Sequence, residues 1–207
     1  MSLFKRSQLD DRTKAKFQYY IPSDASTARN GGGSDLKVTY GRGYRRQNLL
    51  TDGGFESFST RCTGFCYNAT TPTWQGTSPT DGRNDASVFR FEEFAHTGKS
   101  LAVLGSATGF DDFSGTLTVV HPLATTAGRT YEVSFFHQST FSGPIHEVGS
   151  FVEVVWNGQV VKAIRPGYED WKLYQVNVVA TGSDTLAFRG GAAPAWSFID
   201  DITLFLL

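Results

Sequence analysis

Two adjacent carboxylates lie inside the last apolar segment of the chain, and this feature constrains the fold more than any other. The segment AWSFIDDITLF, residues 195–205, is rich in residues that favour strands, but it contains Asp200 and Asp201. An ionised pair in a buried strand is costly unless it has a partner such as a metal ion. The segment NLLTDGGFE, residues 48–56, carries Glu56 and looks like its counterpart. We expect a single sandwich that closes where its first and last strands meet.

Short strand-like segments separated by turns follow one another from residue 48 to the end of the chain. The clearest alternation, in RTYEVSFFHQ at residues 129–138, puts Tyr131, Val133 and Phe135 on one face as core residues. Other expected strands lie at 88–91, 100–104, 115–120, 171–180, 185–189 and 198–206, with a hairpin at 151–161 around Asn157 and Gly158. This spacing predicts an all-β fold, a two-sheet jelly-roll sandwich over residues 48–207.

Residues 1–47 differ from the sandwich in pattern and in charge. Residues 1–46 hold ten Lys or Arg and four Asp or Glu, a net +6, whereas residues 47–207 hold nine and sixteen, a net −7. A solvated tail is one interpretation, but aromatic residues are scarce in disordered segments, so we expect an extended arm that docks on a neighbouring subunit. The predicted anchors are Phe17, Tyr19, Tyr20, Tyr40, Tyr44, Arg45 and Arg46.

The start of the sequence and its two cysteines bear on location. MSLFKR is followed by charged residues rather than by an apolar core, so we expect no signal peptide, and no apolar run is long enough for membrane insertion. The overall net charge of −1 argues against nucleic acid as a partner. The spacing of Cys62 and Cys66 allows a small disulfide or two free thiols. No histidine or further cysteine lies at zinc-ligand spacing, so we expect no zinc site.

Five motifs occur in order along the expected sandwich. They are NLL with GGFE at 48–56, GKSL at 98–101, AGRTY at 127–131 leading into VSF, Trp171 with Tyr174, and FIDDI at 198–202. This order resembles the galactose-binding-like sandwich of the family 4, 9 and 22 carbohydrate-binding modules, over about residues 48–207. Such sandwiches serve as sugar binders, adhesion modules and structural pieces of assemblies, so the fold alone does not fix the function.

The resemblance implies a structural calcium ion that ties the first strand to the last. Glu56 and Asp201 are at the matching positions, with Asp200 and Asp52 as further candidates. Calcium takes six to eight oxygens, so backbone carbonyls or water would complete its coordination. The alternative is that these carboxylates pair with an arginine or accept hydrogen bonds from backbone amides.

Sugar binding requires aromatic platforms for the ring faces and polar side chains for the hydroxyls. The candidates are Trp74 in a long loop at 57–85, Phe136 and Gln138 on the outward face of a strand, and Trp196 beside the last strand. For Trp196 the alternative is a residue that covers the edge of the core, and Trp74 could instead be a lid or an interface residue.

Catalytic motifs are missing from the sequence. Hydrolysis by paired carboxyl groups needs both groups to face one cleft. In the acidic pairs Glu92-Glu93 and Asp111-Asp112 the two residues are adjacent, so their side chains would face opposite sides of a strand or point into solvent on a loop. The four histidines lack metal-ligand spacing, and no nucleophile elbow, phosphate loop or HExxH motif occurs. We therefore expect a protein that is not an enzyme.

Two functions remain. The first is a structural or decoration protein of a larger oligomeric assembly such as a phage virion, anchored by residues 1–47 and displaying the sandwich outward in an extracellular location. The second is a carbohydrate-binding module that recognises a glycan in an aromatic groove. The two are compatible, because a decoration protein can also bind surface glycans.

Overall fold

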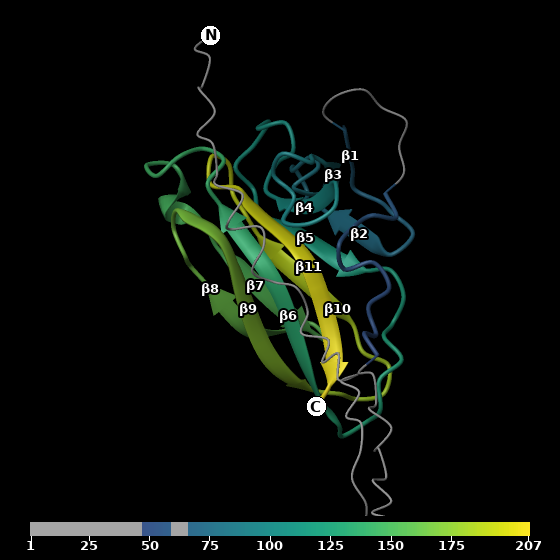
Figure 1. Cartoon of the computed structure of the whole chain (residues 1–207). Helices are drawn as coiled ribbons and strands as arrows, with labels where there is room; N and C mark the ends of the chain where they lie inside the picture. Colours follow the sequence, from purple (N-terminus) through teal and green to yellow (C-terminus); the bar gives the residue numbers. More distant parts are fainter. Residues whose placement is uncertain (1–46, 59–65) are drawn as a thin grey trace, which may run out of the picture. The chain divides into compact units, whose positions relative to one another are not determined.

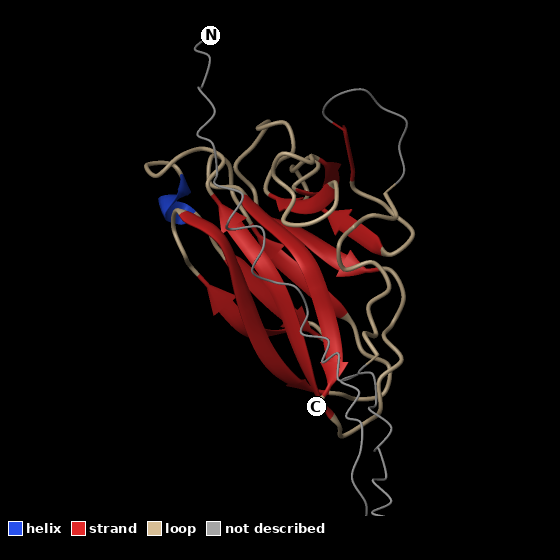
Figure 2. Cartoon of the chain, viewed as in Figure 1, coloured by secondary structure: helices blue, strands red, loops and turns tan. Residues whose placement is uncertain are grey.

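The computed structural model describes residues 47–58 and 66–207, which form two antiparallel β-sheets packed face to face (Figure 1). The described regular structure is strand apart from one short 3₁₀ helix, η1 (Glu147–Gly149) (Figure 2). The predicted all-β, two-sheet sandwich is therefore confirmed. The predicted arm, apart from Gln47, lies outside the described residues. No helix in the described part of the chain is both long and apolar enough to cross a membrane.

The six-stranded sheet has the order β1-β3-β4-β11-β6-β9 and the five-stranded sheet the order β2-β5-β10-β7-β8. The first sheet contains β1 (Cys66–Asn68), β3 (Ala86–Arg90), β4 (Ser100–Leu104), β6 (Thr130–Ser139), β9 (Glu169–Val179) and β11 (Ser197–Leu206). The second contains β2 (Trp74–Thr77), β5 (Gly115–Val119), β7 (Val152–Trp156), β8 (Gln159–Ile164) and β10 (Leu186–Gly190). Cys66 is disulfide-bonded, and Cys62, the other cysteine of the sequence, lies outside the described residues.

The main core lies between the two sheets. Tyr131, Val133 and Phe135 are buried there, so the alternation of β6 correctly predicts its inward face. The hairpin predicted at Asn157 and Gly158 joins β7 to β8, and both residues have the positive φ angles that such a turn requires.

The first and last segments of the sandwich meet, although the first is not a strand. The Leu49 N–H donates to Leu204 O (3.0 Å) and the Ile202 N–H donates to Gly53 O (3.0 Å). No strand is assigned within residues 47–58, which corrects the expected first strand. A Cβ atom at Gly53 would overlap Ile202 O, so only glycine allows this approach.

Trp74 is a core residue, which corrects its predicted place in a long loop. It begins β2, has 0% of its surface exposed, and lies between the rings of Phe55 and Phe188. Its indole N–H donates to Asp52 O at 2.8 Å. A side chain with no exposed surface offers no face to a sugar, so the prediction of Trp74 as a sugar platform is wrong.

The six-stranded sheet is apolar on both faces. Ala102 and Leu104 of β4 point into the main core, whereas Leu101 and Val103 of the same strand pack on the outer face. The outer cluster also contains Phe89 and Phe198, from β3 and β11. Loops after β3, β4 and β6 carry residues to this face, and the candidate site lies among them.

Replacing Trp74 by alanine tests its core placement. We expect Trp74→Ala to lower the free energy of unfolding by about 3–5 kcal/mol, the usual cost of removing a large aromatic side chain from a core. Chemical denaturation followed by circular dichroism measures the change. Val179→Ala is the control, because Val179 is 63% exposed and should change stability by no more than about 0.5 kcal/mol. Equal effects of the two substitutions would contradict the placement.

Candidate functional site

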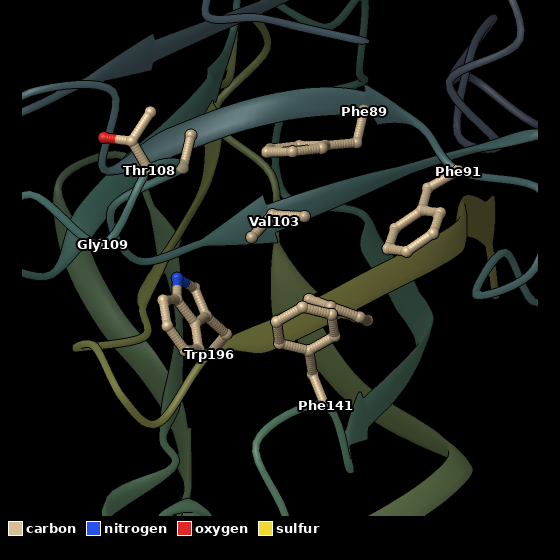
Figure 3. A pocket seen from close by; sticks show the side chains of 9 residues that line it. Phe89, Phe91, Val103, Thr108, Gly109, Phe141 and Trp196 are labelled. Carbon is tan, nitrogen blue, oxygen red and sulfur yellow. The ribbon is translucent and has the colours of Figure 1, made fainter. Parts of the chain in front are cut away.

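A pocket of about 190 Å³ opens on the outer face of the six-stranded sheet (Figure 3). Strands β3, β4 and β11 each contribute an apolar side chain, and the loops that follow β3, β4 and β6 contribute the others, together with the residue before β11. The lining residues are Phe89, Phe91, Val103, Ala107, Thr108, Gly109, Phe141, Trp196 and Phe198. None of them has an ionisable side chain, and the pocket is therefore an aromatic, uncharged hollow.

Trp196 is fixed in the pocket by a hydrogen bond and by two glycines. Its indole N–H donates to Ser106 O at 2.8 Å. A Cβ atom at Gly105 would lie 2.8 Å from Trp196 Cδ1, and Gly109 faces the other end of the ring. Both glycines have positive φ angles, so the loop after β4 needs them for its conformation as well as for the contact. The ring is thus held in one orientation.

Phe141 forms an exposed wall of the pocket. It extends from the loop after β6, is 44% exposed, and meets Trp196 edge to face at a centroid distance of 5.6 Å. It also contacts Phe94 at 5.4 Å and Phe198 at 5.7 Å. Figure 3 shows the rings of Phe141 and Trp196 next to each other at the pocket. The half-exposed ring of Phe141 is available to a ligand.

A second aromatic group lies on the same face of the sheet. The imidazole of His96 stacks on Phe136 at 3.8 Å and meets Trp171 edge to face at 5.4 Å. Gln138 is paired across the sheet with Phe198, so the two side chains share a face, and its amide Nε2 donates to Asp170 Oδ1 at 3.0 Å.

Of the predicted ligand residues, Phe136, Gln138 and Trp196 share this outer face, and Trp74 does not. Trp196 lines the pocket, whereas Phe136 belongs to the second aromatic group. The ligand residues predicted from the sequence do not include Phe91 and Phe141. Phe91 could have been noticed, because VFRF continues an apolar alternation onto the outer face. Phe141 follows the end of β6 in a polar loop and has no local signal.

The predicted metal ligands Glu56 and Asp201 bind the same loop, at residues 96–100. Glu56 Oε1 accepts hydrogen bonds from the backbone N–H groups of Lys99 (2.6 Å) and Ser100 (2.8 Å). Asp201 contacts His96 Nδ1 through Oδ2 (2.6 Å) and accepts from Thr97 Oγ1 through Oδ1 (2.7 Å). These carboxylates therefore already have the amide and side-chain partners that the alternative to calcium requires.

Asp200 is the buried member of the acidic pair. Its Oδ2 accepts from the backbone N–H groups of His96 (2.9 Å) and Thr97 (3.3 Å). Burial, together with the charge of Asp201, raises the pKa of Asp200 to about 8. Asp52 does not share the partners of this pair, because its two carboxylate oxygens accept from the Ser57 N–H and the Ser57 hydroxyl.

These residues have the type of donor atom that calcium needs, but too few of them converge on one point to complete its coordination. Carboxylate and hydroxyl oxygens are the donors that calcium takes. Among the residues that the structure describes, however, no group of three or more His, Cys, Asp or Glu side chains is arranged to hold a metal ion. Backbone carbonyls would have to supply much of the coordination, and calcium at Glu56 and Asp201 stays a prediction.

Glu147 is a buried carboxyl in the loop that carries Phe141. Its Oε1 accepts from the Ser142 N–H at 2.9 Å, but its Oε2 is buried without a hydrogen-bond partner. Burial raises the pKa of Glu147 to about 7. The folded state thus prefers the neutral carboxylic acid, which ties the stability of this loop to pH.

Glu147→Gln tests the cost of that buried charge. A raised pKa contributes stability that is fully present below the ordinary value of 4.5 and is lost as the pH rises through about 7. Glutamine stays neutral, so from pH 4.5 to above 7 its free energy of unfolding should gain about 3 kcal/mol relative to the native protein. Urea unfolding at a series of pH values measures this gain. The exposed Glu92→Gln is the control, and a pH profile that is the same for Glu147→Gln and native protein would contradict the prediction.

Chelation tests the calcium prediction. A ligand that binds only the folded state raises the melting temperature by mass action, so EDTA should lower the midpoint and excess CaCl₂ should restore it. Glu56→Gln should reduce the response, and Asp52→Asn should keep it because Asp52 is bound to Ser57. A midpoint that does not move with EDTA would remove the support for calcium.

Comparison with known proteins identifies the fold. No family model matches the sequence, and no curated protein matches it. Similar solved structures include TmCBM61 in complex with β-1,4-galactotriose, with 20% identity over 78% of this chain and 99% of that chain and a TM-score of 0.52. A family 16 carbohydrate-binding module has 17% identity over 76% of this chain and 99% of that chain, with a TM-score of 0.46. The CBM22-1 xylan-binding domain of Paenibacillus barcinonensis Xyn10C has 16% identity over 78% of this chain and 95% of that chain, with a TM-score of 0.49. The likeness to TmCBM61 shows the fold of this chain, the galactose-binding-like β-sandwich that its order of motifs predicts.

Proposed function

We propose that the sandwich is a non-catalytic carbohydrate-binding domain and that its glycan site is the aromatic pocket on the outer face. The observation that carries the proposal is a surface hollow whose walls include the half-exposed ring of Phe141 and the fixed indole of Trp196. Sugar rings have apolar C–H faces that pack on aromatic rings, and a rigid platform loses little entropy on binding. The likeness to the fold of TmCBM61, solved with a galactotriose, supports the same class of ligand.

The size and lining of the pocket suit one sugar residue at a time. A volume of about 190 Å³ corresponds to about six water molecules, so one ring can enter while the rest of a glycan lies over the rim. Thr108 is the one lining residue with a side-chain hydroxyl. With so few polar side chains, stacking contributes most of the binding.

The chemistry of the pocket favours binding over hydrolysis. Glycoside hydrolysis uses two carboxyl groups on either side of the scissile bond. All nine lining residues are apolar, glycine or threonine, so the pocket itself supplies neither an acid nor a base. This lining supports a non-catalytic role.

Attachment to a larger assembly stays a prediction. The arm of residues 1–47 and its anchors, on which the virion structural or decoration role depends, lie almost entirely outside the described residues. Glycan binding by the sandwich is compatible with such a role and does not depend on it.

A glycan array followed by calorimetry tests the proposal on the full chain. We expect binding to at least one glycan, and Phe141→Ala should weaken it about tenfold or more, because stacking on the exposed ring is lost. Ile145→Ala is the matched control, since Ile145 is in the same loop, is 86% exposed and does not line the pocket. Absence of binding to any glycan would overturn the function, and equal affinities of Phe141→Ala and native protein would overturn the site.

A further inference from the structure

A pair of acidic side chains lies where two loops meet at the start of β3. Asp85 is the residue before β3, and Asp111 belongs to the loop between β4 and β5. Asp85 is completely buried. Asp111 is partly buried, and it lies close enough to Asp85 for a direct side-chain interaction and for charge repulsion. The pair therefore joins a buried carboxyl to one that solvent can reach.

The backbone holds Asp85 in place but leaves its carboxyl unsatisfied. The Asp85 N–H donates to Ser78 Oγ (3.1 Å), and its carbonyl accepts from the Gly105 N–H (2.6 Å). Neither Oδ1 nor Oδ2 has a hydrogen-bond partner, although both are buried. Gly82 packs so closely that a Cβ atom there would overlap Asp85 Oδ2. The loop is thus folded around a carboxyl group whose neighbouring donors, the Ser78 hydroxyl and the Arg83 N–H, make no hydrogen bond of normal geometry with it.

Asp111 brings acceptors rather than donors to this carboxyl. Its own oxygens accept from the Arg83 N–H (3.1 Å) and the Phe113 N–H (3.1 Å). The nearby guanidinium of Arg83 lies over the ring of Phe110, 4.5 Å from its centroid, and forms no ion pair with the described residues. Burial and the charge of Asp111 raise the pKa of Asp85. Two facing carboxyl groups need a cation or a proton between them.

We propose that Asp85 and Asp111 hold a divalent cation between these two loops, and that Ca²⁺ is the ion that fits best. Two carboxylates can supply up to four of the six to eight oxygens that Ca²⁺ takes, and the irregular loops suit its flexible coordination better than the strict octahedron of Mg²⁺. As at Glu56 and Asp201, the described residues add no third acidic, histidine or cysteine side chain, so the Ser78 hydroxyl, loop carbonyls and water would have to supply the remaining positions.

This site is separate from the one predicted at Glu56 and Asp201. Those carboxylates bind residues 96–100, at the turn that joins the end of β3 to the start of β4. Asp85 and Gly105 lie at the other end of the same two strands. A five-residue strand is about 16 Å long, so one ion cannot serve both places.

The cation would also brace the aromatic pocket. The loop that contains Asp111 presents Ala107 and Thr108 to the pocket and holds Trp196 through Ser106 O. Binding of Ca²⁺ should therefore strengthen glycan binding. This consequence rests on the proposed glycan function, whereas the cation site does not.

Calcium binding to the full chain, measured by equilibrium dialysis after treatment with EDTA, tests the site. We expect Asp111→Asn to bind one Ca²⁺ fewer per chain than the native protein, because asparagine loses the charge and keeps only one of the two oxygens that accept from Arg83 and Phe113. Asp112→Asn is the matched control: it removes one charge from an exposed neighbour and should leave the number of bound ions unchanged. Asp85→Asn should also bind one ion fewer. If Asp85→Asn does not fold, the result for Asp111→Asn alone tests the site.

Two results would overturn the proposal. One is an equal number of bound Ca²⁺ ions in Asp111→Asn and native protein. The other is a higher melting temperature for Asp85→Asn that Ca²⁺ does not affect, which would show that a shared proton joins the two carboxyls. A protein that binds Ca²⁺ here but no glycan would support the site and count only against the glycan function.

Discussion

Strand β11 lies between β4 and β6, and it contributes to both apolar layers of the molecule. Ile199, Ile202 and Leu204 point into the main core, and Phe198 points to the outer cluster. Ile199 and Ile202 are three residues apart, which would put them on opposite faces of a regular strand. They share a face because β11 bulges between Asp200 and Thr203, where Asp201 takes a positive φ angle. Without this bulge, alternation would turn either Ile199 or the two later residues away from the core.

An antiparallel sheet usually has one face on the core and one face in water. Here the outer face carries Phe89, Leu101, Val103 and Phe198, so it needs a cover of its own. The loops after β3, β4 and β6 supply that cover with side chains such as Phe94, Ala107 and Phe141. The pocket is the part of the face where these loops do not meet. The candidate site thus follows from the apolar pattern of the strands and is not an addition to the fold.

The sequence predicts features that depend on local pattern and misses those that depend on partners far along the chain. Alternation places Tyr131 and Val133 correctly, because every second residue of a strand shares a face. Trp74 looks like a loop residue because β2 has only four residues between polar and glycine-rich segments, and its burial comes from packing against Phe55 and Phe188. Phe141 becomes a pocket wall only through contacts with Trp196 and Phe198, which lie about 55 residues further along.

Three of the four completely buried carboxyls in the described part of the sandwich divide according to their hydrogen-bond donors. The fourth, Asp200, has donors, but burial and the charge of Asp201 still raise its pKa. Asp184 is completely buried, yet Thr125, Asn157 and Thr181 donate to it, and these hydrogen bonds hold its pKa well below the usual range despite burial. Asp85 and Glu147 are equally buried, but both keep oxygens without donors, and burial raises their pKa values. The fold can therefore supply a buried carboxylate with several donors. The unsatisfied ones are both in segments next to the aromatic pocket, where a cation or a proton can change the loops that form its rim.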